Sequence, residues 1–140
     1  MVQEEKDLLL KVLCAMLPYG VNATTTSNRW NGIYTITGYA NDRIYLDCPV
    51  YDKGDDEWLV ESVRPYLRPM SSMTKEERKE YEGFIIHREH VNAQGQEWDI
   101  DCFSFGSVPR LISWLNAHHF DYLGLIKKGL AIEAPEGMYS

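Results

Sequence analysis

The densest helical pattern of the chain lies in residues 107–132. Apolar side chains recur there at intervals of three and four residues, as they do on one side of a helix. They are Val108, Leu111, Ile112 and Leu115. Ser107 suits the N-cap of this helix, and His118 and His119 suit its last turn, where the helix dipole favours cations. The pattern predicts a helix that starts after Ser107 and ends at the two histidines.

A second, shorter helix is expected over residues 122–128. Asp121 can cap its first turn by accepting from free backbone N–H groups. Gly129 suits the left-handed position that follows its last turn. Residues 130–132 then form a short final strand or a buried tail. The C-terminal part is therefore predicted to be a helical pair.

Residues 3–17 form an amphipathic helix by the same criterion. Acidic side chains near its start favour the positive end of the helix dipole, and Pro18 ends it. Its apolar stripe consists of Leu9, Val12, Leu13, Met16 and Leu17.

After this helix the pattern changes to alternation, which indicates strands. Asn31-Gly32 is the strongest short hairpin signal, because both residue types tolerate the positive φ of a type I′ turn. It should join a strand that ends at Trp30 to a strand over residues 33–39. A second turn at residues 40–42 leads into a third strand. The pattern predicts a three-stranded antiparallel meander.

Residues 58–70 also look extended. Pro65 and Pro69 cannot donate a hydrogen bond to a β-ladder, so this segment is predicted to be an edge strand or to lie along the domain. Alternation along it places Arg64, Tyr66 and Arg68 on one face.

Further along, Thr74 and Glu77 form a capping box, in which each side chain accepts from the backbone N–H of the other residue. The helix that follows, over residues 75–82, is charged nearly all round and is predicted to be solvent-exposed.

A second hairpin is predicted between residues 84 and 105. One register places Arg88 opposite Asp99. The alternative places Glu89 opposite Asp99, and like charges that face each other across two strands are unfavourable. We therefore prefer the first register.

These elements predict a single α+β domain over residues 1–140. Its antiparallel sheet consists of the three-stranded meander and the hairpin. The N-terminal helix and the C-terminal helical pair cover this sheet.

The amino-acid composition makes some classes of binding partner less favourable than others. The formal net charge is −7, which disfavours binding to duplex nucleic acid or to an anionic membrane. Cys14, Cys48 and Cys102 are widely spaced and contain no CxxC pair, which favours reduced thiols over a zinc site. The apolar run at residues 8–17 is too short to span a bilayer, and the acidic N-terminus is unlike a signal peptide. We expect a cytoplasmic protein.

Few residues suggest catalysis. Glu97, Asp99 and Asp101 lie on one face of a predicted strand and could hold a divalent metal for hydrolysis. A salt-bridged solvent face explains them more simply, because the preferred register supplies cations opposite them. No glycine-rich nucleotide loop or nucleophile elbow is present in the sequence. We predict no cofactor, no metal site and no catalytic residue, and the pattern favours a protein that is not an enzyme.

The sequence contains more residues suited to binding than to catalysis. Nine tyrosines and four tryptophans occur, several of them beside arginine or asparagine. Aromatic and arginine side chains dominate binding energetics. The candidates for binding a ligand or partner are Arg64, Tyr66, Arg68, Trp114, His118, His119 and Tyr122.

Two segments, RPYLRPMSSMTKEE at residues 64–77 and WLNAHHFDYLGLIKKGLAIEAPEGMY at residues 114–139, carry a resemblance. The chain resembles uncharacterised small proteins encoded by Bacteroides-type gut bacteria and by their phages and mobile elements. The resemblance implies a genetic setting, and with it the cytoplasm of a bacterial host. It implies no activity and no site residue.

Three functional hypotheses follow. The first is a non-catalytic accessory protein of a phage or mobile element that binds a host protein, such as an inhibitor of host defence. The second is a protein that binds or sequesters a small nucleotide-like ligand in a pocket at the subunit interface of a homo-oligomer. The third is a metal-dependent hydrolase built on the three acidic residues.

Overall fold

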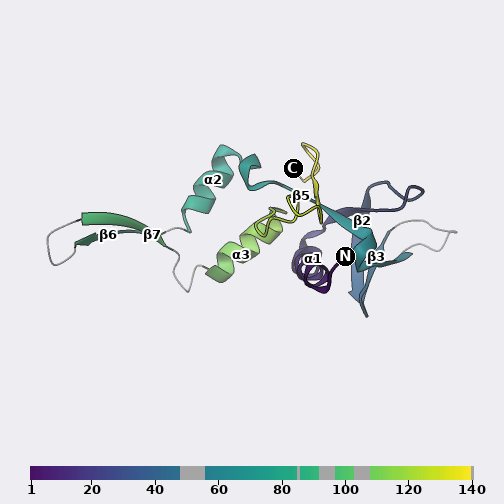
Figure 1. Ribbon diagram of the computed structural model, residues 1–140. Coiled ribbons are helices and arrows are strands. Elements are labelled where there is room, and N and C mark those ends of the chain that lie inside the picture. Colours follow the sequence, from purple (N-terminus) through teal and green to yellow (C-terminus); the bar gives the residue numbers. More distant parts are fainter. Residues whose placement is uncertain (48–55, 85, 92–96, 103–107, 140) are drawn as a thin grey trace. The chain divides into compact units, whose positions relative to one another are not determined.

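The chain consists of two compact units (Figure 1). The first unit comprises Met1–Met70 and Asn116–Ser140, and the second unit comprises Ser71–Leu115. The expectation of one domain over residues 1–140 stays a prediction. The computed structural model describes residues 1–47, 56–84, 86–91, 97–102 and 108–139, with the backbone alone at residues 56, 86–91 and 97–102.

The first unit is built on a six-stranded sheet. In spatial order its strands are β4 (Asp56–Leu59), β3 (Arg43–Leu46), β2 (Tyr34–Ala40), β1 (Asn22–Thr25), β5 (Val63–Leu67) and β8 (Ile132–Glu133). Neighbouring strands are antiparallel except β5 and β8, which are parallel. The α+β class is therefore confirmed. The predicted arrangement of a meander and a hairpin in one sheet under a helical pair is not confirmed. β4, β5 and β8 extend the sheet, and the hairpin over residues 86–102 forms a separate two-stranded sheet.

The turn between β2 and β3 lies where the alternation predicted it. Asn41 and Asp42 have φ angles of 50° and 62°, which is the backbone conformation of a type I′ turn. Ala40 and Arg43 form the pair of residues that closes this hairpin. The turn fixes the register between β2 and β3.

The prediction of a tight hairpin at Asn31-Gly32 is wrong. β1 ends at Thr25 rather than at Trp30, and residues 26–33 form a loop. The hydroxyl of Thr25 donates to the carbonyl of Trp30 and accepts from the backbone N–H of Ser27. These local hydrogen bonds stabilise a wide loop instead of a continued ladder.

β5 is an interior strand, although Pro65 led to the prediction of an edge strand. The N–H of Thr26 donates to the carbonyl of Ser62 over 2.9 Å, and hydrogen-bonded positions alternate along an antiparallel ladder. Pro65 pairs with Ala23 at a position where its nitrogen points away from β1. The ladder to β8 begins one residue later, at Tyr66. The proline therefore removes no ladder hydrogen bond.

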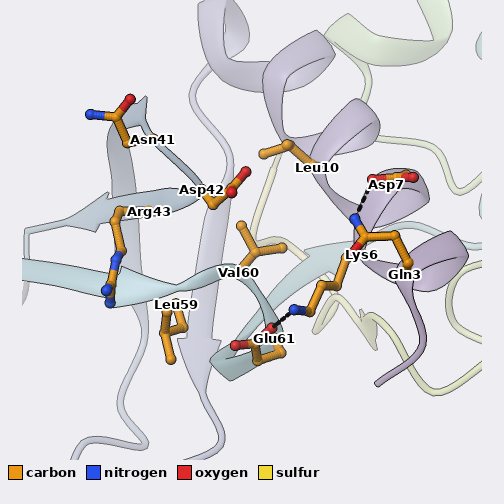
Figure 2. Close-up of a pocket in the computed structure, with 10 residues that line it drawn as sticks. All are labelled: Gln3, Lys6, Asp7, Leu10, Asn41, Asp42, Arg43, Leu59, Val60 and Glu61. Atoms are coloured by element: carbon orange, nitrogen blue, oxygen red, sulfur yellow. Dashed lines mark hydrogen bonds and ion pairs between the residues drawn. The ribbon is translucent and has the colours of Figure 1, made fainter.

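Helix α1 (Gln3–Met16) confirms the predicted N-terminal helix. A short 3₁₀ turn, η1 (Leu17–Tyr19), follows at Pro18, where the α-helix cannot continue. The first half of α1 borders a pocket (Figure 2). Its apolar stripe points into the core, as predicted, through Leu9, Val12, Leu13 and Met16.

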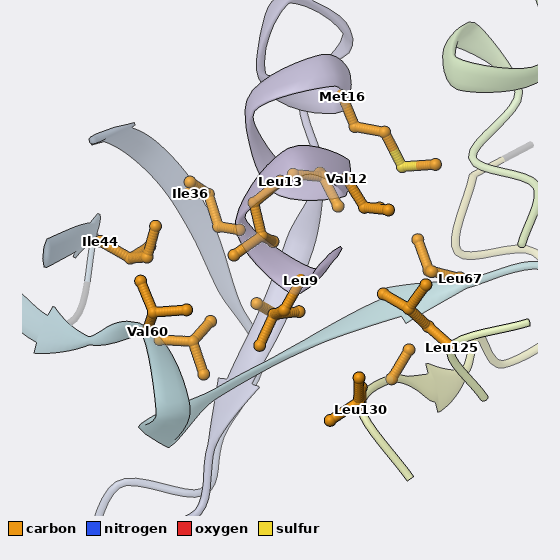
Figure 3. Close-up of a cluster of buried hydrophobic side chains, with 14 of the residues drawn as sticks. Leu9, Val12, Leu13, Met16, Ile36, Ile44, Val60, Leu67, Leu125 and Leu130 are labelled. Carbon is orange, nitrogen blue, oxygen red and sulfur yellow. The ribbon is translucent and has the colours of Figure 1, made fainter. Parts of the chain in front are cut away.

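The core of the first unit joins three parts of the chain (Figure 3). The stripe of α1 packs with side chains from the sheet and from the C-terminal segment. These include Ile36, Ile44, Leu46, Val60, Val63, Leu67, Leu125 and Leu130. Fully burying a side chain of this size contributes about 1.5–3 kcal/mol, so this shared core is what holds the C-terminal segment against β5.

The prediction of a second helix over residues 122–128 is wrong, because this segment consists of turns. The Asp121 carboxylate caps the segment as expected, and accepts from the N–H groups of Leu125 over 2.7 Å and Ile126 over 2.9 Å. Gly124, however, has a φ of 74°, which a right-handed helix does not contain.

The chain end follows the prediction more closely. Gly129 has a φ of 76°, the left-handed conformation expected of it. Leu130 and Ala131 are buried, and β8 follows them as a short final strand beside β5.

The second unit contains helix α2 (Lys75–Glu82), strands β6 (Ile86–Val91) and β7 (Glu97–Cys102), and most of helix α3 (Val108–Ala117). The capping box is confirmed, with Thr74 and Glu77 bonded to each other in both directions over 2.9 and 3.1 Å. None of the α2 residues is buried, as the charge pattern predicted.

The preferred register of the second hairpin is wrong. β6 and β7 pair with Glu89 opposite Asp99, and Arg88 is opposite Ile100. The repulsion between two carboxylates across a ladder is worth less than about 1 kcal/mol. Such a term is too small to select a register against the backbone pairing of six residues on each strand.

Among the described residues, no helix is both long and apolar enough to cross a membrane.

Candidate functional site

A pocket of about 280 Å³ lies in the first unit, between the first half of α1, the β2–β3 turn and the end of β4 (Figure 2). The short 3₁₀ turn η2 (Val60–Ser62) contributes Val60 and Glu61 to its lining. Its lining residues are Gln3, Lys6, Asp7, Leu10, Asn41, Asp42, Arg43, Leu59, Val60 and Glu61.

The pocket wall combines a small apolar area with a polar border. Leu10, Leu59 and Val60 supply the apolar area, and the other lining residues are polar or charged. Val60 belongs to the core and is only 4% exposed, whereas Leu59 is 41% exposed. Leu59 thus presents an apolar side chain to solvent beside charged groups, at the last residue of β4.

An ion pair crosses the pocket from α1 to η2. The Nζ of Lys6 lies 2.9 Å from a carboxylate oxygen of Glu61. Their hydrogen bond raises the pKa of Lys6 and lowers the pKa of Glu61. Both groups are therefore charged at neutral pH. A general base needs a free lone pair and a general acid a proton that it can release near neutral pH, so this pair holds charge rather than moving protons.

The other charges of the site are also held in place. The Nε of Arg43 lies 3.4 Å from the carboxylate of Glu57. The amide of Gln3 donates to Asp7 over 2.9 Å. Asp42 occupies the type I′ turn, and its negative charge contributes to raising the pKa of Lys6.

The predicted arginines lie outside this pocket and are engaged elsewhere. A guanidinium nitrogen of Arg64 donates to the backbone carbonyls of Glu61 and Val63 over 2.8 and 3.0 Å. Burial lowers the pKa of Arg64. The guanidinium of Arg68 lies over the ring of Phe120, 4.3 Å from its centroid. The alternation that put Arg64 and Tyr66 on the outer face of β5 is confirmed by burial, since Val63, Pro65 and Leu67 face the core.

Tyr66 and His119 meet at a residue that the sequence did not single out, Tyr139. The Tyr139 hydroxyl accepts from the N–H of Asn22 over 2.9 Å and donates to the carbonyl of Tyr66 over 2.7 Å. Burial raises the pKa of Tyr139 to about 12. Its ring stacks on His119, with centroids 3.7 Å apart and planes 5° from parallel.

His119 is a structural residue rather than an exposed ligand. It is 7% exposed, and its Nε2 lies 2.9 Å from the carbonyl of Gly20. Burial lowers the pKa of His119. The neutral ring therefore donates from Nε2, and its Nδ1 has no hydrogen-bond partner within the described part of the chain.

The remaining candidates also make internal contacts. His118 stacks against Phe120 with centroids 6.2 Å apart. The Tyr122 hydroxyl donates to the side-chain oxygen of Asn116 over 2.8 Å. Trp114, in the second unit, donates from Nε1 to Glu80 over 2.8 Å.

Of the predicted set, Arg68 and His118 meet at Phe120, and the N–H of Arg68 donates to the carbonyl of His119 over 2.8 Å. The role of these residues in binding stays a prediction.

The pocket residues escaped prediction because they come from three distant segments with ordinary surface composition. The available signal was the acidic start of α1 together with the turn at residues 40–42. Neither feature indicates a pocket until the core brings them together.

The metal hypothesis concerns side chains outside the described ones, since β7 is described by its backbone alone. The backbone register moves Arg88 from its predicted place opposite Asp99, and it places Glu89 there and His87 opposite Asp101. Among the described residues, no group of three potential metal ligands occurs.

No protein-family model, curated protein or solved structure matches this chain.

Proposed function

We propose that the chain is a non-catalytic protein that binds another protein at the pocket beside Leu59. The observation that carries this proposal is the exposed Leu59 side chain at the end of β4, in a pocket lining that is otherwise mostly polar or charged. A small apolar centre with a polar border is the usual anatomy of a protein interaction site. The two ionic pairs, Lys6–Glu61 and Arg43–Glu57, hold the border in a defined geometry.

A small nucleotide-like ligand is the second hypothesis, and the contacts of the first unit favour it less. Its phosphate would need available guanidinium groups, and Arg64 and Arg68 bond to the backbone and to Phe120. The pocket of about 280 Å³ is also at the lower limit of small-molecule sites, which span about 300–1,000 Å³.

The metal-dependent hydrolase stays a third proposal on its acidic residues alone. The first proposal also includes a genetic setting, a phage or mobile element, and a class of partner, a host defence protein. Both rest on the resemblance of residues 64–77 and 114–139 to small proteins of gut bacteria and their phages.

The proposal is tested with two matched variants of exposed apolar residues. Leu59→Asp changes the pocket, and Ile132→Asp changes a residue of similar exposure, 38%, in β8 of the same unit. A partner is captured by the tagged wild-type chain in its source organism, identified, purified and titrated by calorimetry against all three proteins.

We expect Leu59→Asp to weaken the purified complex at least about tenfold, as loss of a central apolar contact does, and Ile132→Asp to leave it unchanged. Equal affinities for the two variants would contradict the proposal. Native mass spectrometry on the same preparations distinguishes the alternative. A bound small molecule that is lost in Arg64→Ala would replace the protein partner as the function.

A further inference from the structure

We infer that the edge of β4 that no described strand covers receives an extended, basic segment of a partner protein, which pairs with β4 as an additional strand. This inference rests on the proposed function and specifies how the partner binds. Leu59 belongs both to the pocket wall and to β4, so one bound segment would contact the edge and the pocket together.

The backbone of β4 offers hydrogen-bonding groups along this edge. β4 ends the sheet, and of the described strands it pairs with β3 alone. The closing pair Ala40 and Arg43 directs the backbone groups of Arg43 toward β2. The N–H of Asp47 also donates to β2, at the carbonyl of Thr35. Asp47 lies four residues after Arg43, so alternation along the strand gives both residues the same direction.

The direction of each β4 backbone group follows by alternation. Because Arg43 points to β2, its partner Leu59 directs its own N–H and C=O away from β3. Glu57, opposite Tyr45, does the same. Glu57 therefore presents both a donor and an acceptor outward, as strand addition requires. Leu59 presents its N–H, because its carbonyl, at the N-cap of η2, accepts the first hydrogen bond of that turn.

Charge selects the kind of segment that fits. Among the described residues that line the pocket and their ion-pair partners, Lys6 and Arg43 are the cations, and each is already paired with a carboxylate. The acids around them are Asp7, Asp42, Glu57 and Glu61. The net negative charge favours lysine and arginine side chains on the incoming strand.

The same charge argues against a second copy of this chain on the edge. Each copy carries a net charge of −7 and would bring the same acidic residues to the contact. Charged side chains on edge strands commonly prevent such self-pairing. A basic partner avoids this repulsion and a second copy does not.

Leu59→Pro is a selective test of the edge. Leu59 has φ −64° and ψ 143°, which proline adopts without strain. Its N–H points outward, so proline removes no hydrogen bond to β3. Leu59→Ala is the matched control, because it shortens the same side chain and keeps the N–H. Thermal unfolding of both variants checks that the fold is retained.

The probe is a capped octapeptide, Lys-Thr-Val-Lys-Val-Thr-Val-Lys, titrated against the full chain at low salt. Two matched peptides accompany it, one with glutamate in place of lysine and one N-methylated at alternate residues. We expect the lysine peptide to bind and both matched peptides to fail. We expect Leu59→Pro to weaken binding about tenfold or more, through the lost donor and the ring at the edge, and Leu59→Ala to weaken it less.

Amide hydrogen exchange gives a readout that does not depend on a variant that folds. The bound lysine peptide should slow exchange at the Glu57 and Leu59 amides and leave the Trp58 amide, which already faces β3, unchanged. No binding of the lysine peptide, no new protection at Glu57 and Leu59, or equal binding by a folded Leu59→Pro would each overturn the inference. A wild-type dimer that becomes monomeric in Leu59→Pro would assign the edge to a second copy and overturn it as well.

The variants distinguish a wrong binding mode, the added strand at β4, from a wrong binding site, the pocket. A purified partner that is lost in Leu59→Asp and retained in Leu59→Pro would leave the pocket as the binding site and remove the added strand. A partner equally bound by Leu59→Asp and Ile132→Asp would remove both.

Discussion

At the scale of single residues, Tyr139 and His119 make buried contacts that stabilise the first unit. No pattern in the sequence predicts these contacts. The Tyr139 hydroxyl takes the place of ladder hydrogen bonds where β1 and β5 part, between Asn22 and Tyr66. His119 adopts a φ of 61° and places its ring between Tyr139 and the carbonyl of Gly20. The hydrogen-bond partners of these side chains lie 99 residues away for His119, and 117 and 73 residues away for Tyr139.

Removing the Tyr139 hydroxyl should destabilise the first unit. Tyr139→Phe leaves the Asn22 N–H and the Tyr66 carbonyl without their partner, and such a loss costs about 1–3 kcal/mol. Chemical denaturation measures the change in the free energy of unfolding. Tyr39→Phe, at a ring that is 42% exposed, is the control and should be near neutral. Equal stabilities of the two variants would show that the Tyr139 bridge contributes nothing.

Acid should destabilise the protein through His119. Burial lowers its folded-state pKa below the ordinary value of 6.5, so the unfolded chain binds a proton that the folded chain resists. This contribution to stability is present above about pH 6.5 and is lost as the pH falls below that value. We expect the thermal midpoint of wild type to fall more between pH 8 and pH 5 than that of His119→Asn, since asparagine also tolerates positive φ.

Asn28→Ala is the control, because it changes an exposed side chain that does not titrate. It should retain the wild-type dependence on pH. A His119→Asn variant with the full wild-type dependence would assign the acid sensitivity to other groups.

At the scale of elements, a few side-chain caps decide where segments turn. The Thr74 and Glu77 capping box could be identified from sequence because both partners lie within one helical turn. The same reasoning correctly identified Asp121 as a cap. It wrongly predicted a helix after Asp121, since Gly124 adopts a left-handed conformation and the segment forms turns. The Asn31-Gly32 signal failed for a related reason: the local bonds of Thr25 compete with the ladder.

The Asp121 carboxylate should stabilise the turns of residues 122–128, and these turns position Leu125 and Leu130 in the core. Asp121→Ala removes two hydrogen bonds to backbone N–H groups, and we expect a loss of about 1–3 kcal/mol in the free energy of unfolding. Asp121→Asn keeps one acceptor and should lose less. Denaturation of both variants, with the exposed Glu136→Ala as the control, measures the order. Asp121→Ala as stable as the control would contradict this role.

At the scale of the whole molecule, binding is proposed for the first unit, where the core joins α1, the sheet and the C-terminal segment. Its pocket brings together residues 3–10, 41–43 and 59–61. No short sequence pattern relates these three segments. The sheet order, with β1 between β2 and β5 and β8 outside β5, is a property of the same core.

The sequence alone determined the features that depend on near neighbours. These are the α1 stripe with its end at Pro18, the Asn41 turn, the capping box, the alternation of β5 and the α+β class. Each is decided by contacts within a few residues, where periodicity and backbone preferences act directly. Their locations were therefore predictable.

Only the tertiary structure decided which distant segments meet. It placed Pro65 in an interior strand, bonded Arg64 and Arg68 internally, and assembled the pocket around Leu59. The register of β6 and β7 was decided in the same way, by backbone pairing over the whole hairpin. Such pairings depend on the summed burial and hydrogen bonding of many residues, and no single residue pattern encodes that sum.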